Sequence, residues 1–182
     1  MTNLFPIQKQ QEHPIFGRFN ARYGDIIVEH CPPLNKFQIN VLTVEEFRKN
    51  PGELPVIEID DADAFAYSSD LQDDDVASTK ARIIFNQSRI DALGLTEEEQ
   101  YAAIAHEIGH IIYRFSSLKQ MFPGEQGQEI YAEEAACKIE LASPLFSLLD
   151  KLEHSGFYSD AQRRFGSRKK YIKCMFLDII DE

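Results

Sequence analysis

Alternating apolar and polar residues in the first half of the chain predict short β-strands. A period of two places alternate side chains on one face of a sheet, and the β-branched residues in these segments favour an extended backbone. Thr43 to Lys49 has the polar start and apolar spacing of a short capped helix. We expect strands at residues 37–42, 56–60, 64–67 and 81–86.

The N-terminal part of the chain gives a weaker pattern. Residues 1–23 are mostly polar and contain Pro6 and Pro14, which we interpret as helix breakers in an irregular arm. The apolar run at residues 25–31 fits either a strand or a buried helical turn.

Helical spacing dominates the second half. Thr96 and Glu99 form a Thr-x-x-Glu capping box, which predicts a helix that begins there and continues to about Phe115. Further helices are expected from about residue 128 to 141, over 145–152, and from about 159 to 180. Strands followed by helices predict a single α+β domain over residues 1–182, with a small mixed sheet packed on the helix that follows Thr96.

Composition narrows the class of protein. The chain of 182 residues is 43% hydrophobic and 27% charged, which is ordinary for a globular domain. Its net charge of −11 argues against nucleic acid as the main partner. No apolar run reaches the roughly 20 residues of a membrane span, and the first residues lack the layout of a secretory signal. We therefore expect a cytoplasmic protein, whose three separated cysteines stay reduced.

The expected helix after Thr96 carries the sequence His106-Glu107-Ile108-Gly109-His110. Histidines four residues apart stack on one face of a helix, about 5–6 Å apart at Cβ, so both imidazoles can reach one divalent ion. Glu107 projects to the side of that ion, where a general base is needed. This composition would produce such a string only about 0.02 times by chance. The alternative is a pair of hydrogen-bonded core histidines.

A third metal ligand is expected on the next helix. Two histidines bind catalytic zinc together with a third protein ligand, usually a carboxylate. Glu129 follows His110 at a distance that a helix-loop-helix return can close. Glu133, one turn further along the same face, could instead be the ligand, or could accept the free ring N–H of a zinc-bound histidine. Small residues, Ala132, Ala135 and Ala136, would let the two helices approach closely.

Other charged and titratable groups favour simpler interpretations. His13 and His30 fit surface or packing positions better than ligand positions. The acidic stretch 70–76 could bind calcium, but its spacing fits a solvated loop better. The basic residues of the last helix are Arg163, Arg164, Arg168, Lys169, Lys170 and Lys173. They could bind an acidic partner or lipid, or they could form a solvated face opposite Phe165, Ile172, Phe176 and Ile179.

The two helical motifs together resemble the gluzincin zinc peptidases. His106-Glu-Ile-Gly-His110 followed by Glu129-x-x-Ala-Glu133-x-x-Ala is most similar to the CAAX-type membrane endopeptidases and their soluble relatives, the minigluzincins. In that group the first Glu of the second motif binds zinc, and an Asp stands where this chain has Glu133. Residues 63–66, Asp-Ala-Phe-Ala, also resemble the Asn-Ala-Phe-Ala strand of the group. The resemblance covers about residues 56–140 and implies a zincin-like fold.

The resemblance also implies a mechanism. Zinc bound by His106, His110 and Glu129 would activate a water molecule, with Glu107 as the general base. An extended peptide would pair with a strand edge, for which residues 64–67 are the candidate. Membrane members of the group have a His-Pro followed by a downstream Arg after the second motif, and this chain has no His-Pro there, although Arg164 follows Tyr158 by six residues.

Two residues are therefore candidates for the oxyanion donor. Tyr158 falls near the expected place by spacing, and His154 is the second candidate. For each, the alternative is a surface or packing residue.

We therefore expect a zinc metalloendopeptidase with one zinc ion per chain and a peptide or protein substrate. One alternative is a regulatory or phage-type protein with a gluzincin-like fold that binds or cleaves a single partner protein. Another is a structural domain with a closed zinc site or no zinc. The sequence pattern favours no particular cleavage specificity or oligomeric state.

Overall fold

The structure is a computed structural model that describes residues 13–32, 34, 38–49, 65–69, 80–115 and 124–177. These residues are mostly helical and include one small sheet, in agreement with the α+β prediction. The elements, in chain order, are α1 (Pro14–His30), β1 (Gln38–Thr43), α2 (Val44–Lys49), β2 (Phe65–Ser69), β3 (Lys80–Phe85), α3 (Gln87–Leu93), α4 (Glu97–Phe115), α5 (Gly124–Lys138), α6 (Ala142–His154) and α7 (Ala161–Phe176).

The sheet is mixed, as the sequence predicted. Among the described strands, β3 lies in the middle, parallel to β1 and antiparallel to β2. Alternate side chains of β3 serve two cores: Ile83 and Phe85 belong to the main core, while Ile84 packs with Val44 and Phe47 beside α2. The sheet therefore has apolar contacts on both faces, and β2 is left at one edge of the described sheet.

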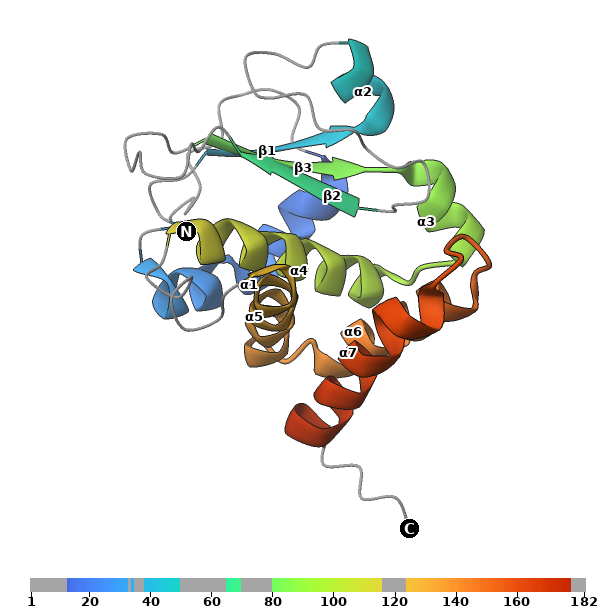
Figure 1. Cartoon of the computed structure of the whole chain (residues 1–182). Helices are drawn as coiled ribbons and strands as arrows, with labels where there is room; N and C mark the ends of the chain where they lie inside the picture. The colour runs from blue at the N-terminus through green and yellow to red at the C-terminus, as the bar shows by residue number, and fades with distance from the viewer. Residues whose placement is uncertain are drawn as a thin grey trace.

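Helix α4 is the centre of the fold. Figure 1 shows the sheet lying over α4, and α4 contacts α1, α5, α6, β2 and β3. Every residue from Tyr101 to Tyr113 is buried, so this stretch meets protein on all sides. A helix in this position gives any polar side chain on it a largely dry environment, where each such group needs a partner.

The N-terminus of α4 is held by polar contacts with α1 and α6. The predicted capping box is present, because the Thr96 amide donates to Glu99 Oε2 at 2.7 Å and the Glu99 amide donates to Thr96 Oγ1 at 3.3 Å. Glu99 also accepts hydrogen bonds from Ser147 and Lys151 of α6, each at 2.7 Å. Burial opposes ionisation of Glu99, but these hydrogen bonds outweigh it and lower the pKa of its carboxyl.

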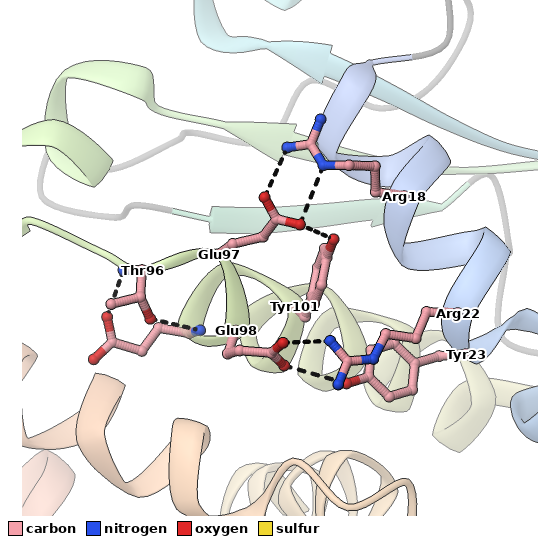
Figure 2. A network of polar contacts seen from close by, with 8 residues as sticks. Arg18, Arg22, Tyr23, Thr96, Glu97, Glu98 and Tyr101 are labelled. Atoms are coloured by element: carbon pink, nitrogen blue, oxygen red, sulfur yellow. Dashed lines mark hydrogen bonds and ion pairs between the residues drawn. The ribbon is translucent and has the colours of Figure 1, made fainter.

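The first turn of α4 also faces two arginines of α1 (Figure 2). Arg18 forms a bidentate pair with Glu97, at 3.1 and 3.2 Å, and Arg22 pairs with Glu98. Tyr23 donates a further hydrogen bond to Glu98 at 3.2 Å. Because acidic side chains are also favourable at a helix N-terminus, these contacts fix where α1 lies along α4.

The irregular N-terminal arm was a wrong prediction for residues 14–23. These residues form the first part of α1, and the run at 25–31 forms its last turns instead of a strand. Pro14 begins the helix, since the first helical position has no use for an amide N–H and suits the fixed φ of proline. The overlooked signal is the helical spacing of the buried residues Ile15, Phe16, Phe19, Tyr23 and Ile27.

Other element predictions are mostly confirmed. The strands at 37–42, 64–67 and 81–86, and the short helix after Thr43, occur within one or two residues of the expected bounds. Helix α5 begins at Gly124, earlier than the expected start near residue 128. Glycine lowers the helix propensity of this first turn, but it does not by itself end a helix. Helix α3 had no predicted counterpart. The strand at 56–60 and the acidic stretch at 70–76 lie outside the described residues.

Helices α4 and α5 meet at an unusually short distance beside Gly109. A Cβ atom placed on Gly109 would lie 2.6 Å from Ala132 Cα and 3.0 Å from the Ala132 carbonyl oxygen. Both are backbone atoms of α5, so they cannot rotate away as a side chain would. The predicted close approach is therefore confirmed, and it requires glycine at position 109.

We expect the Gly109→Ala substitution to destabilise the protein by about 1–3 kcal/mol, because the added methyl forces the two helices apart. Gly166→Ala in α7 is the matched control, since its added Cβ would meet only side-chain atoms at 3.6 and 3.7 Å. The control should lie within about 1 kcal/mol of the wild type, in the stabilising direction, because alanine favours helix. Urea unfolding measures both variants, and equal stability of the two would contradict the close-contact argument.

Candidate metal centre

Three side chains from α4 and α5 converge on one point. His106 and His110 lie one turn apart on α4, with their Nε2 atoms 3.1 Å apart. Glu129 of α5 places one carboxylate oxygen 3.4 Å from His106 Nε2 and the other 3.4 Å from His110 Nε2. The histidines are buried and Glu129 is partly buried, so the predicted ligand set is brought together in a sheltered position.

The spacing of these atoms suits a metal ion. Three corners of a tetrahedron around an ion with bonds of about 2.0–2.1 Å lie about 3.3–3.4 Å apart. The two imidazole nitrogens are 3.1 Å apart, and each lies 3.4 Å from its nearer Glu129 oxygen, His106 Nε2 from Oε2 and His110 Nε2 from Oε1, so the individual contacts are of that length. Two unprotonated imidazole nitrogens that face each other at 3.1 Å repel, because each directs a lone pair at the other. A proton or a cation between them removes this repulsion. The cluster could therefore hold one metal ion with little rearrangement.

Arg168 of α7 completes this group, although the sequence analysis placed it on a solvated face. Its side chain is 14% exposed. The guanidinium contacts Glu129 Oε2 at 3.0 Å through Nη1, Glu133 Oε1 through Nε, and His106 Nε2 at 3.3 Å through Nη2. The solvated-face prediction is therefore wrong for this residue, which joins α7 to both ligand-bearing helices.

A sequence signal for Arg168 did exist. Arg168 is three residues after Phe165 and four before Ile172, and both of these are buried. Residues at that spacing share one face of a helix, so Arg168 lies on the apolar face of α7 rather than opposite it. An arginine at such a position needs a buried acidic partner, and Glu133 provides one.

The structure assigns Glu133 a different contact from the one expected. Glu133 is fully buried, and its Oε1 pairs with Arg168. It does not accept the ring N–H of His106, because within the described part of the chain His106 Nδ1 has no hydrogen-bond partner. That prediction was wrong, since α7 supplies a cation that α4 and α5 alone do not reveal. Glu129, not Glu133, joins the histidine cluster.

Charge at the site favours an ionised Glu129. Burial opposes ionisation of this carboxyl, but the imidazole of His106 and the guanidinium of Arg168 outweigh it and hold its pKa far below the ordinary value of 4.5. A carboxylate must be deprotonated to bind a metal, so Glu129 is in the form that a ligand requires at neutral pH.

The candidate general base lies beside the cluster. Glu107 follows His106 on α4 and is 9% exposed. A carboxylate at this position could accept a proton from a reacting group held at the cluster.

The remaining histidine predictions are consistent with packing and surface roles. His13 stacks on Phe85 with ring centroids 4.7 Å apart. His30 is exposed, and its Nδ1 hydrogen-bonds the Ile26 carbonyl oxygen.

Neither oxyanion candidate has a described contact with the ligand cluster. The Tyr158 ring packs against Phe165 and Arg164, and exposed His154 hydrogen-bonds the Asp150 carbonyl oxygen of its own helix. Asp150 and Glu153 also lie close to His154, but Lys169 pairs with both carboxylates and supplies the balancing charge there. The region is therefore explained as an ion-pair network.

Comparisons with protein-family models, with curated proteins and with solved structures find no match to this chain. None of the described helices is both long enough and apolar enough to cross a membrane. Functional inference therefore depends on the side chains and their geometry.

We expect the protein to retain about one equivalent of transition metal after loading with Zn²⁺ or Co²⁺ and dialysis. Glu129→Gln should weaken binding at least about 100-fold, because it removes a charged ligand. Glu134→Gln is the matched control, since Glu134 is on the same helix but bonds Lys138 and Tyr171 instead. Elemental analysis and competition with a chelator measure both. Retention of metal by Glu129→Gln at the level of the control would contradict the ligand assignment.

Proposed function

We propose that this protein is a zinc-dependent endopeptidase with a zincin-like domain of the gluzincin type. The observation that carries the proposal is the convergence of His106, His110 and Glu129, whose ligand atoms are close enough to hold one metal ion, with buried Glu107 next to His106 on α4. Two imidazoles and one carboxylate favour zinc or a similar transition metal over calcium or magnesium, which prefer oxygen ligands.

The donor set therefore fits zinc. Bound there, zinc would act as a Lewis acid that polarises a peptide carbonyl and lowers the pKa of a water molecule toward about 7. Glu107 would accept a proton from the attacking water on its carboxylate. As the new C–O bond forms and the C–N bond breaks, Glu107 would pass that proton to the leaving amide nitrogen. The products are a carboxylic acid and an amine, and transfer of the remaining water proton from acid to amine leaves a carboxylate and an ammonium group at neutral pH.

Strand β2 would hold the substrate. It is an edge strand among those described, and it contacts α4, which carries the cluster. An extended peptide can add to such an edge through main-chain hydrogen bonds, which are independent of side-chain identity. This position supports the earlier expectation for residues 64–67, part of which forms β2.

Arg168 would stabilise the developing negative charge. Its Nε and Nη1 groups are held by Glu133 and Glu129, so the guanidinium has a fixed orientation. Its Nη2 group faces His106 Nε2, an atom that a metal would also use. With that lone pair engaged by a metal, the Nη2 donor would be available to a carbonyl oxygen at the site. A preoriented donor of this kind strengthens its hydrogen bond as charge develops.

The test of the general base is Glu107→Gln. We expect this variant to keep about one equivalent of zinc and to lose about 10²–10⁴-fold in the rate of cleavage, because the amide cannot accept the proton. Glu98→Gln, on the same helix but paired with Arg22 at the surface, should keep its activity. The assay uses zinc-loaded protein and a library of internally quenched peptides. A rate for Glu107→Gln equal to that of Glu98→Gln would refute the role.

A second test concerns Arg168. We expect Arg168→Lys to lower kcat about 10²–10³-fold with little change in KM. The lysine ammonium lacks the planar guanidinium that binds two carboxylates and thereby fixes the orientation of its Nη2 donor. Zinc content should stay near one equivalent. Removing the guanidinium leaves Glu133 buried without its partner, so Arg168→Gln is also made together with Glu133→Gln to remove that charge. Normal kcat in a folded, zinc-loaded Arg168→Gln/Glu133→Gln protein would exclude the proposed role.

A further inference from the structure

A cavity lies between α1, α4 and α5. It encloses about 110 Å³. Its apolar lining comes from all three helices and consists of Ile27, Ala105, Ile108, Ile112, Ala135 and Ile139. The remaining lining residues are His30, Cys31, Tyr131 and Lys138. A cavity of about 150 Å³ with apolar walls binds benzene, so this cavity can enclose most of an aromatic ring, with the rest of the molecule beside the exposed residues His30 and Lys138.

The interior of this cavity is electrically neutral. Burial raises the pKa of Tyr131 to about 12, and it also raises the pKa of the Cys31 thiol. Both groups therefore keep their protons at neutral pH. A charged guest would lose its hydration without gaining a counter-ion inside, so an uncharged guest is favoured.

Tyr131 offers one polar contact to such a guest. Within the part of the chain that the structure describes, no protein group hydrogen-bonds its hydroxyl, and its ring lies 6.0 Å from that of Tyr113. Tyr131 lines the cavity together with the polar residues His30, Cys31 and Lys138. A guest with one hydroxyl or carbonyl group can satisfy the Tyr131 hydroxyl.

The charged and polar residues at the rim of the cavity, His30 and Lys138, favour a small molecule over a protein as the bound partner. His30 is exposed, and Lys138 is 51% exposed and pairs with Glu134 at 3.2 Å. A protein that covered the cavity would have to bury this ion pair and the imidazole, which costs free energy. A small molecule enters between α1 and α5 and leaves the charged rim in water.

We propose that this cavity is a binding site for a small uncharged molecule that combines an aromatic ring with one hydrogen-bonding group. The site is separate from the metal cluster and does not depend on the proposed peptidase function. Its walls include Ala105, next to His106, and Tyr131, two residues after Glu129. A bound molecule therefore contacts both helices that carry the metal ligands.

The experiment uses phenol and benzene as probes with the ¹⁵N-labelled full chain. Titration followed by NMR should give saturable shifts confined to amides of α1, α4 and α5 around the cavity. Tyr131→Phe should weaken phenol binding about 5- to 10-fold through loss of one hydrogen bond, and should leave benzene binding within about twofold. Ala135→Leu, which fills the cavity, should abolish binding of both probes.

Two controls make the outcome decisive. Ala92→Leu adds the same volume at an exposed position of α3 and should bind both probes as the wild type does. Tyr131→Phe leaves the apolar walls intact, so it tests the site even if Ala135→Leu fails to fold. Shifts that are absent, spread over the surface, or equal in wild type and folded Ala135→Leu would overturn the proposal. Equal weakening of phenol and benzene by Tyr131→Phe would overturn the role of the hydroxyl.

Discussion

The backbone contact between Gly109 of α4 and Ala132 of α5 is the constraint on which the candidate site depends. Because glycine has no side chain, the backbone of α5 approaches α4 closely enough for Glu129 to reach both imidazoles at 3.4 Å. Any larger residue at position 109 would meet main-chain atoms and would separate the helices. The positions of the three side chains are therefore set by helix packing. Side chains on two rigid helices are held more precisely than side chains on a loop.

Electrostatics sets a second condition on the same region. Three carboxylates, those of Glu107, Glu129 and Glu133, and two imidazoles lie in or near the core, where unpaired polar groups cost free energy. Arg168 of α7 pairs with Glu129 and Glu133 and supplies one positive charge. A bound divalent metal ion would supply two more. The arrangement suggests why an arginine is placed on the buried face of α7: its planar fork can hold two carboxylates at once, and the ammonium of lysine cannot do this with fixed geometry.

The rest of the fold positions α4. The sheet lies over one side of it, α1 is fixed to its first turn by Arg18 and Arg22, and α6 is tied to Glu99 of its capping box. These contacts leave β2 close to α4 and at an edge of the sheet that the described strands form. They also leave the cavity between α1, α4 and α5. One helix thus borders two different chemical environments, a polar cluster and a neutral apolar cavity.

The sequence alone determined the local features. Period-two and helical spacing predicted β1, β3 and α4, the Thr96–Glu99 box marked where α4 begins, and four-residue spacing placed His106 and His110 on one face, because these are short-range properties of the backbone. Ala132, Ala135 and Ala136 indicated close packing, and the spacing after His110 indicated Glu129, while the need for glycine at position 109 became visible only in the structure. Tertiary structure decided the rest. Helical spacing marks α1 and the buried face of α7, but only the tertiary structure shows that Phe16 and Phe19 pack in the core and that Arg168 pairs with Glu133, 35 positions earlier. Such pairings depend on how distant segments meet, and no local pattern specifies that.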